Sequence, residues 1–159
     1  IYRLPVYPRI FHRHMSYSFA FAQGIEMETK VDIIKDSYIF MNYTFQDPRD
    51  NPGNDLPFVA EHYGNFGVNV HYWKYINTNL STFVSGRHSR EEGDNRDDLP
   101  AYALPNLSVI GKEFFKTMEI QGTVFNLLDK DYSDPGPTSI PGNLPRPERT
   151  LFVGLSYQF

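Results

Sequence analysis

The chain has 159 residues, no cysteine, 16% aromatic residues and a formal net charge of −4. A small negative charge does not favour nucleic acid as a partner. No apolar run approaches the roughly 18 residues that a membrane-spanning helix needs. The absence of such a run excludes a helical membrane protein. It does not exclude a membrane protein made of β-strands, because strands that alternate between apolar and polar residues have only moderate overall hydrophobicity.

Seven segments alternate between apolar and polar residues, which is typical of strands with two different faces. The clearest is the last, in which apolar side chains occupy every second position from Leu151 to an aromatic C-terminus, Phe159. No segment shows a helical period. In chain order the predicted strands are 25–33, 38–45, 65–72, 79–87, 106–109, 118–124 and 151–159, with an eighth candidate within 1–15.

The connections between these strands alternate between short and long. The short ones are 35–37, 74–78 and 112–116, and the long ones, rich in Gly, Pro, Asn and Asp, are 46–61, 88–101 and 128–148. Outer-membrane barrels have short periplasmic turns and long outer loops. The order therefore favours an antiparallel transmembrane β-barrel over the alternative, a soluble β-sandwich whose apolar faces pack inward.

A barrel in a membrane also needs aromatic girdles at both interfaces. The predicted topology places eight aromatic residues near the periplasmic rim: Tyr38, Tyr72, Trp73, Tyr75, Phe114, Phe115, Tyr157 and Phe159. It places six near the outer rim: Tyr43, Phe45, Phe58, Tyr63, Tyr102 and Tyr132.

Four motifs follow one another in the sequence. Gly24, Glu26 and Glu28 belong to Gly-Ile-Glu-Met-Glu, and Tyr102 ends Leu-Pro-Ala-Tyr. Asn126, Asp129 and Tyr132 belong to Val-Phe-Asn-Leu-Leu-Asp-Lys-Asp-Tyr, and Arg149 ends Pro-Arg-Pro-Glu-Arg before the strand that carries Tyr157 and Phe159. The ordered set, over residues 11–159, resembles the C-terminal half of TonB-dependent outer-membrane receptors. Glu148 stands where these receptors commonly have glycine, which affects one turn and no strand.

The resemblance implies a barrel of about 22 strands with a plugged lumen, of which residues 1–159 would form the C-terminal seven or eight strands. The plug domain and the TonB box would lie outside this chain. The implied partners are outer-membrane lipid, the remainder of the same barrel and its plug, TonB through the missing N-terminal part, and the barrel-assembly machinery through the C-terminal strand. The implied location is the outer membrane of a Gram-negative bacterium.

By the same resemblance, the whole receptor would import a scarce ligand such as an iron–siderophore, cobalamin, haem or another metal complex. The alternative is a passive porin or a structural barrel, and a plug with a TonB box would distinguish the receptor from it. No nucleophile motif or phosphate-binding glycine loop is present, so we expect neither an enzyme nor a cofactor.

Several motif residues have expected physical roles. Asn126 and Asp129 lie where a strand gives way to a loop, and their side chains can cap or turn the backbone there. Arg149 begins the last strand and is expected to pair with a loop carboxylate, Asp129 or Asp131. Glu26 and Glu28 are expected to point to the lumen, where water or a plug can solvate charge.

His12 and His14 are two residues apart, so on a strand they would share one face and could hold a metal together. No third ligand is identifiable, and a solvated rim or lumen stretch is the simpler explanation. In the second long loop, Arg87, Arg90, Asp94 and Arg96 are candidates for contact with ligand. Arginines suit an anionic chelate and carboxylates a cation, whereas a solvated, self-paired loop is the default explanation.

Overall fold

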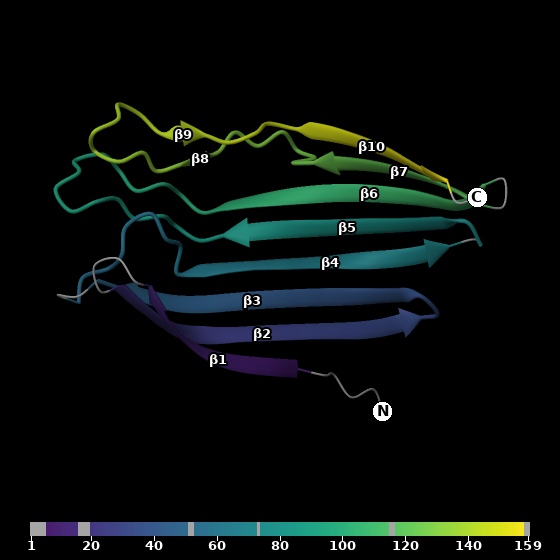
Figure 1. Ribbon diagram of the computed structural model, residues 1–159, viewed down its shortest axis with the longest axis horizontal. Helices are drawn as coiled ribbons and strands as arrows, with labels where there is room; N and C mark the ends of the chain where they lie inside the picture. The colour runs from purple at the N-terminus through teal and green to yellow at the C-terminus, as the bar shows by residue number, and fades with distance from the viewer. Residues whose placement is uncertain (1–5, 16–19, 51–52, 73, 115–116, 158–159) are drawn as a thin grey trace.

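The computed structural model describes residues 6–15, 20–50, 53–72, 74–114 and 117–157. Eight strands form one antiparallel sheet in the order β1-β2-β3-β4-β5-β6-β7-β10, so that β1 to β7 follow their order in the chain and β10 pairs with β7 (Figure 1). Among the described residues, no helix has the length and apolar character needed to cross a membrane. The strands are β1 (Val6–Met15), β2 (Ala20–Ile34), β3 (Ser37–Arg49), β4 (His62–Tyr72), β5 (Ile76–Ser85), β6 (Tyr102–Phe114), β7 (Met118–Phe125) and β10 (Thr150–Tyr157), with β8 (Ser133–Asp134) and β9 (Leu144–Pro145) forming a separate two-stranded sheet.

The all-β antiparallel fold predicted from the sequence is confirmed, and β1 is the eighth strand. Several strands are longer than predicted: β2 begins at Ala20 and β4 at His62, β3 continues to Arg49, and β6 extends from Tyr102 to Phe114.

The stretches added to β3 and to the start of β6 are informative. Each added stretch contains a proline. Pro48 pairs with β2 on one side, but on the other side the pairing of β3 with β4 has already ended at Phe45. Likewise, Pro105 pairs with β5, whereas the pairing of β6 with β7 begins only at Leu107. Both prolines thus occupy positions that are locally at a sheet edge, where a missing N–H is tolerated.

One face of the sheet is apolar across its width. A single row of directly paired residues runs from Val31 on β2 through Ile39, Val68, Leu80, Leu107 and Val124 to Leu151 on β10. These side chains are not covered by a second layer: Leu80 is 42% exposed and Leu151 70%. The soluble sandwich would need this row to be packed inside, so the structure rejects that alternative.

The opposite face is polar, and most of the buried side chains lie on it. The paired row from Asp32 to Phe152 passes through Tyr38, Asn69, Asn79, Ser108 and Thr123. Among the described residues other than proline and glycine, the buried apolar side chains are Ala60, Leu99 and Leu104, whereas the buried polar ones are Ser37, Thr44, Asn69, Ser85, Thr123 and Asn126. A buried interior that is mainly polar is the reverse of a soluble core and matches the lumen side of a barrel wall.

The predicted aromatic girdles are partly wrong. Tyr43 and Phe45 do lie on the apolar face at the loop end, where the Tyr43 hydroxyl contacts His62 Nδ1 at 2.7 Å. Tyr38 instead lies on the polar face under Lys30, whose Nζ is 4.0 Å from the ring centre. Tyr63 on β4 and Tyr102 on β6 both pair with Ser85 on β5, and they also lie on the polar face. Trp73 and Phe115 lie outside the described residues. The prediction grouped rings by their nearness to a rim, whereas successive strand residues alternate between faces, so a ring near a rim can lie on either face.

Candidate functional site

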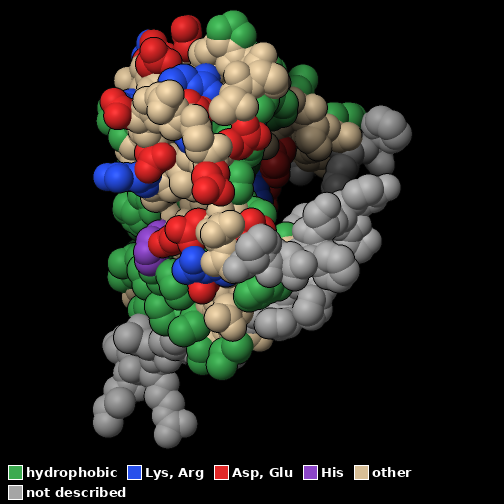
Figure 2. Space-filling model, turned by 90° about the vertical axis from the view of Figure 1, so that its left-hand side faces the viewer, with side chains coloured by type: hydrophobic (Ala, Val, Ile, Leu, Met, Phe, Trp, Pro, Cys, Tyr) green, Lys and Arg blue, Asp and Glu red, His purple; other side chains and the backbone are tan. Residues whose placement is uncertain are grey.

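The described residues of the three long connections, 50 and 53–61, 86–101 and 126–149, lie at one end of the sheet, and those of the short turns lie at the other (Figure 1). Viewed from the loop end, acidic and basic side chains are interspersed over this surface (Figure 2). His88 joins two of the loops, because it forms isolated β-bridges with both Ala60 and Leu99. The Phe58 N–H adds a hydrogen bond to the Ser89 carbonyl at 2.9 Å. Backbone contacts therefore hold the first two long connections together at the loop end.

A cavity of about 250 Å³ opens between the first two of these loops. Arg87, one of the predicted ligand-contacting residues, lines it and is 75% exposed at its side chain, with Asp98 3.9 Å away. The other charged or titratable lining residues are Asp55, Glu61, His62 and Asp98. The lining can thus offer both a guanidinium group to an anion and carboxylates to a cation.

The other predicted loop residues are engaged within the protein. The side chains of Arg90 and Asp94 are only 6% and 5% exposed, and Arg96 donates to both carboxylate oxygens of Asp94 at 2.6–3.0 Å. The side-chain and backbone hydrogen bonds from Arg96 lower the pKa of Asp94 to about 2. These contacts support the self-paired explanation for Arg90, Asp94 and Arg96, whereas a ligand-contacting role for Arg87 stays a prediction.

Asn126 forms the turn that ends β7. It has φ 52°, is 4% exposed, and exchanges two hydrogen bonds of 2.8 Å with the backbone N–H and carbonyl of Lys130. Its own N–H donates to the Asn106 side chain at 2.9 Å. An amide side chain can satisfy both backbone groups at once, so the capping role expected from the sequence is present in the structure.

Asp129 connects this turn to the last strand. It has φ 55°, and its carboxylate accepts from the Arg149 N–H at 2.9 Å and from Arg149 Nη2 at 3.0 Å. Of the two carboxylates expected to pair with Arg149, the structure shows the pair with Asp129. The motif residues therefore join the end of β7 to the start of β10.

Rings gather where β5 and β6 meet the loops on the polar face. The Tyr102 ring lies 4.9 Å from that of Tyr132 and is stacked at 6.0 Å on that of His88, with Phe83 6.3 Å away. Tyr132 thus packs on a lumen-side ring and not in a lipid-side girdle. Burial lowers the pKa of His88. The sequence identified no such cluster, although Phe83 is the one apolar residue that interrupts the polar side of its strand.

The remaining motif residues occupy β2 and the last strand. Gly24 pairs with Gln46, and Glu26 and Glu28 pair with Thr44 and Asn42 on the polar face. Tyr157 pairs with Met118 and is 60% exposed, whereas Phe159 lies outside the described residues.

The proposed metal pair lies on β1. His12 and His14 have the backbone partners Gln23 and Phe21, and their side chains lie outside what the structure describes. In the part of the chain that is described, no three His, Cys, Asp or Glu side chains are grouped as metal ligands would be.

On the polar face, a second cavity of about 360 Å³ lies over the last strands. It is lined by uncharged polar side chains and two phenyl rings: Asn79, Ser81, Asn106, Ser108, Gln121, Thr123, Phe125 and Phe152. Ser108 and Thr123 share a hydrogen bond of 2.9 Å across it. This part of the polar face therefore offers hydrogen-bonding groups without fixed charge.

Comparison with known proteins decides the family. The family described as "TonB dependent receptor-like, beta-barrel" matches residues 20–127, which include β2 to β7. The chain belongs to this family. A comparison with curated protein sequences found no match.

Solved structures of two ferric-chelate receptors and a copper transporter share the fold. The ferric yersiniabactin uptake receptor FyuA of Yersinia pestis has 23% identity and a TM-score of 0.72, over 89% of this chain and 24% of its own. The ferric enterobactin receptor PfeA of Pseudomonas aeruginosa has 19% identity and a TM-score of 0.74, over 89% and 22%. The copper transporter OprC has 15% identity and a TM-score of 0.73, over 94% and 26%. This member of the family thus spans about a quarter of the length of the solved receptors that it matches.

Proposed function

We propose that this chain is the C-terminal wall of a TonB-dependent receptor that imports a metal complex across the outer membrane of a Gram-negative bacterium. The apolar row from Val31 to Leu151 carries this proposal, because it crosses seven paired strands and has no protein cover. Backbone groups in lipid must all be paired, so the wall needs the rest of a closed barrel beside β1 and β10. The polar face would then meet a plug.

For the ligand, we propose an iron–siderophore complex. Two of the solved structures described above are named for ferric siderophores, and a third is a copper transporter. The cavity that contains Arg87 combines a cationic group with carboxylates. Ferric chelates often carry net negative charge, which an exposed guanidinium attracts. Haem and cobalamin are the alternative ligands, and the experiment below tests each of them separately.

The experiment uses the whole receptor from which this chain comes. It would be expressed in cells that lack their own siderophore receptors, and uptake of radiolabelled iron would be measured with a panel of siderophores, haem and labelled cobalamin. We expect uptake of one iron chelate, and we expect deletion of TonB to abolish this uptake. Uptake that persists without TonB would support the alternative, a passive porin, and uptake of none of these ligands would contradict the proposed substrate class.

We also propose that the C-terminal strand is the part recognised by the barrel-assembly machinery. β10 lies at one edge of the sheet, with Leu151, Val153 and Leu155 about 70% exposed on one face. An edge strand with unpaired backbone groups is a template for pairing with another chain. Crosslinking from Val153 to that machinery during assembly would test this, with Ser156 on the other face as the matched position.

A further inference from the structure

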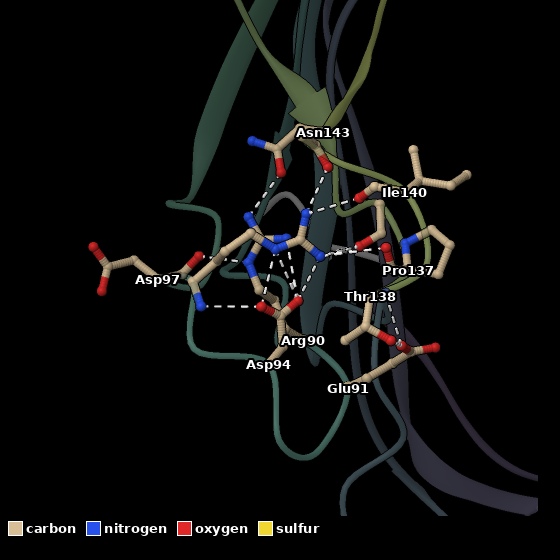
Figure 3. Close-up of polar contacts among 11 residues, drawn as sticks. Arg90, Glu91, Asp94, Asp97, Pro137, Thr138, Ile140 and Asn143 are labelled. Atoms are coloured by element: carbon tan, nitrogen blue, oxygen red, sulfur yellow. Dashed lines mark hydrogen bonds and ion pairs between the residues drawn. The ribbon is translucent and has the colours of Figure 1, made fainter.

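The 86–101 and 126–149 loops meet at one group of charged side chains, although the residues in contact are 40 to 53 positions apart in the sequence (Figure 3). Arg90 and Asp94 are at least 94% covered at their side chains, although both belong to an outer loop. Burying charge is unfavourable unless each group is paired and hydrogen-bonded. The contacts that compensate this cost reach from one loop to the other.

Arg96 makes most of these contacts. Its guanidinium group holds Asp94 with three hydrogen bonds from Nε and Nη2. It also donates to four backbone carbonyl oxygens of the other loop, those of Gly136 (2.9 Å), Pro137 (3.3 Å), Ile140 (3.3 Å) and Gly142 (2.8 Å). Arginine can make these bonds together because its donors form a fixed planar fork.

The carbonyl group positions depend on how the 126–149 loop curls. Gly142 has φ 96°, a backbone conformation that residues with a Cβ rarely adopt. The curl brings the four carbonyl oxygens within hydrogen-bonding distance of the Arg96 guanidinium. Backbone carbonyl and carboxylate oxygens are the ligands that Ca²⁺ takes in loops. Here the guanidinium of Arg96 fills the centre of such an oxygen set.

Two further contacts join the same loops on either side of Arg96. Glu91 accepts hydrogen bonds from the Thr138 N–H at 3.0 Å and from its hydroxyl at 2.9 Å (Figure 3). Arg90 donates to the Asn143 side chain at 2.7 Å and to the Asp97 carbonyl at 2.7 Å. Three separate points of attachment restrict rotation of one loop against the other, which a single ion pair would not do.

We propose that Arg96 acts as a built-in cation that fastens the 86–101 and 126–149 loops into one rigid unit at the outer mouth of the barrel. The unit needs no free metal ion, because the charge at its centre is covalently part of the chain. It therefore keeps its shape in the presence of strong chelators. This inference concerns the loops themselves and holds whether or not the proposed ligand is correct.

Hydrogen exchange of the purified whole receptor in detergent, followed by mass spectrometry, tests the proposal. The informative amides include Thr138, Ile140 and Arg146, each of which donates a hydrogen bond within the unit. In Arg96→Ala, peptides from both loops should exchange at least about tenfold faster, because several charge-assisted bonds are lost together. Peptides from β6 and β7 should keep their protection, which shows that the barrel is still folded.

The matched control is Arg87→Ala, which removes an exposed arginine of the same loop whose ion pair with Asp98 spans 3.9 Å. It should leave exchange in the 126–149 loop unchanged, and EDTA should have no effect on the wild-type receptor. Equal protection in Arg96→Ala and the wild type would overturn the proposal, as would loss of protection in the wild type on adding EDTA. If Arg96→Ala also exposes β6 and β7, Arg96→Lys decides: faster exchange confined to the two loops supports the proposal, and wild-type exchange overturns it.

Discussion

The carboxylate of Asp129 accepts two hydrogen bonds from one residue, Arg149, through its backbone N–H at 2.9 Å and its Nη2 at 3.0 Å. The contact joins the turn after β7 to the first residues of β10, 20 positions later. It thereby sets where the last strand begins to pair with β7, at Thr150 and Phe125.

Replacing Asp129 by alanine should loosen the start of β10. Both side chains are about half exposed, so the ion pair contributes only about 0.2–1 kcal/mol, and the bond to the Arg149 N–H adds a similar amount. Asp129→Asn should be milder, because asparagine keeps an acceptor and tolerates the positive φ of 55°. Hydrogen exchange of the peptide around Arg149 and Thr150 measures this. Equal exchange in both variants and the wild type would contradict the assigned role.

Gly24→Ala should impair assembly of the barrel. A Cβ at Gly24 would overlap with the backbone carbonyl oxygen of Phe45 on β3, so the paired strands would have to separate. Overpacking of this kind typically costs about 1–3 kcal/mol. Gly122→Ala is the matched control, because a Cβ there meets no atom within 4 Å. The folded fraction, measured from heat-modifiable migration of the receptor in gels, should fall for Gly24→Ala alone.

Leu80 and Ser81 are neighbours on β5 that face opposite sides of the sheet, so they provide a test of which side meets lipid. Lysine in place of Leu80 should destabilise the barrel by about 2–4 kcal/mol, the cost of a cationic side chain near the bilayer midplane. Lysine in place of Ser81 should be tolerated, since Ser81 lines the 360 Å³ cavity on the polar face. Unfolding by urea in lipid vesicles measures both. The reverse order of stabilities would mean that the faces are assigned the wrong way round.

Orientation in the membrane can be tested by labelling. Asn95 is exposed in a long loop and Asp36 is exposed in the short turn between β2 and β3. With long loops outside, Asn95→Cys should react with a membrane-impermeant reagent on intact cells, and Asp36→Cys should react only after the cells are opened. Labelling of Asp36→Cys alone on intact cells would reverse the topology.

The pairing of Arg96 with Asp94 should weaken at low pH. Arg96 lowers the pKa of Asp94 from an ordinary 3.8 to about 2, so the charged carboxylate is favoured by the folded loops. A depressed carboxyl pKa contributes stability that is present above the unfolded value, near pH 4, and is lost as pH falls toward 2. Pepsin cleavage within the two loops, normalised to an unfolded substrate, should therefore rise over this range. Asp94→Asn should be cleaved readily at pH 4 as well, and no difference between the two proteins at pH 4 would contradict the prediction.

Features that depend on residues close together in the chain were predictable from the sequence. Alternation along Leu151–Phe159 and the other segments established strands with two faces, and the alternating short and long connections indicated at which end the loops lie. The turn at Asn126 and Asp129 belongs to this class too, because its hydrogen bonds to Lys130 and within residues 126–129 are local. The proposed metal pair, His12 and His14, remains a prediction.

Only the tertiary structure decided features that depend on register and on distant contacts. Tyr38, Tyr63 and Tyr102 are aromatic whichever face they occupy, and pairing with Asn69 or Ser85 places them on the polar one. Likewise the sequence shows charged residues around Arg96, but not that four carbonyl groups some 40 residues away surround its guanidinium. Alternation is a local property of one strand, whereas the position of a loop depends on how the whole sheet brings its connections together.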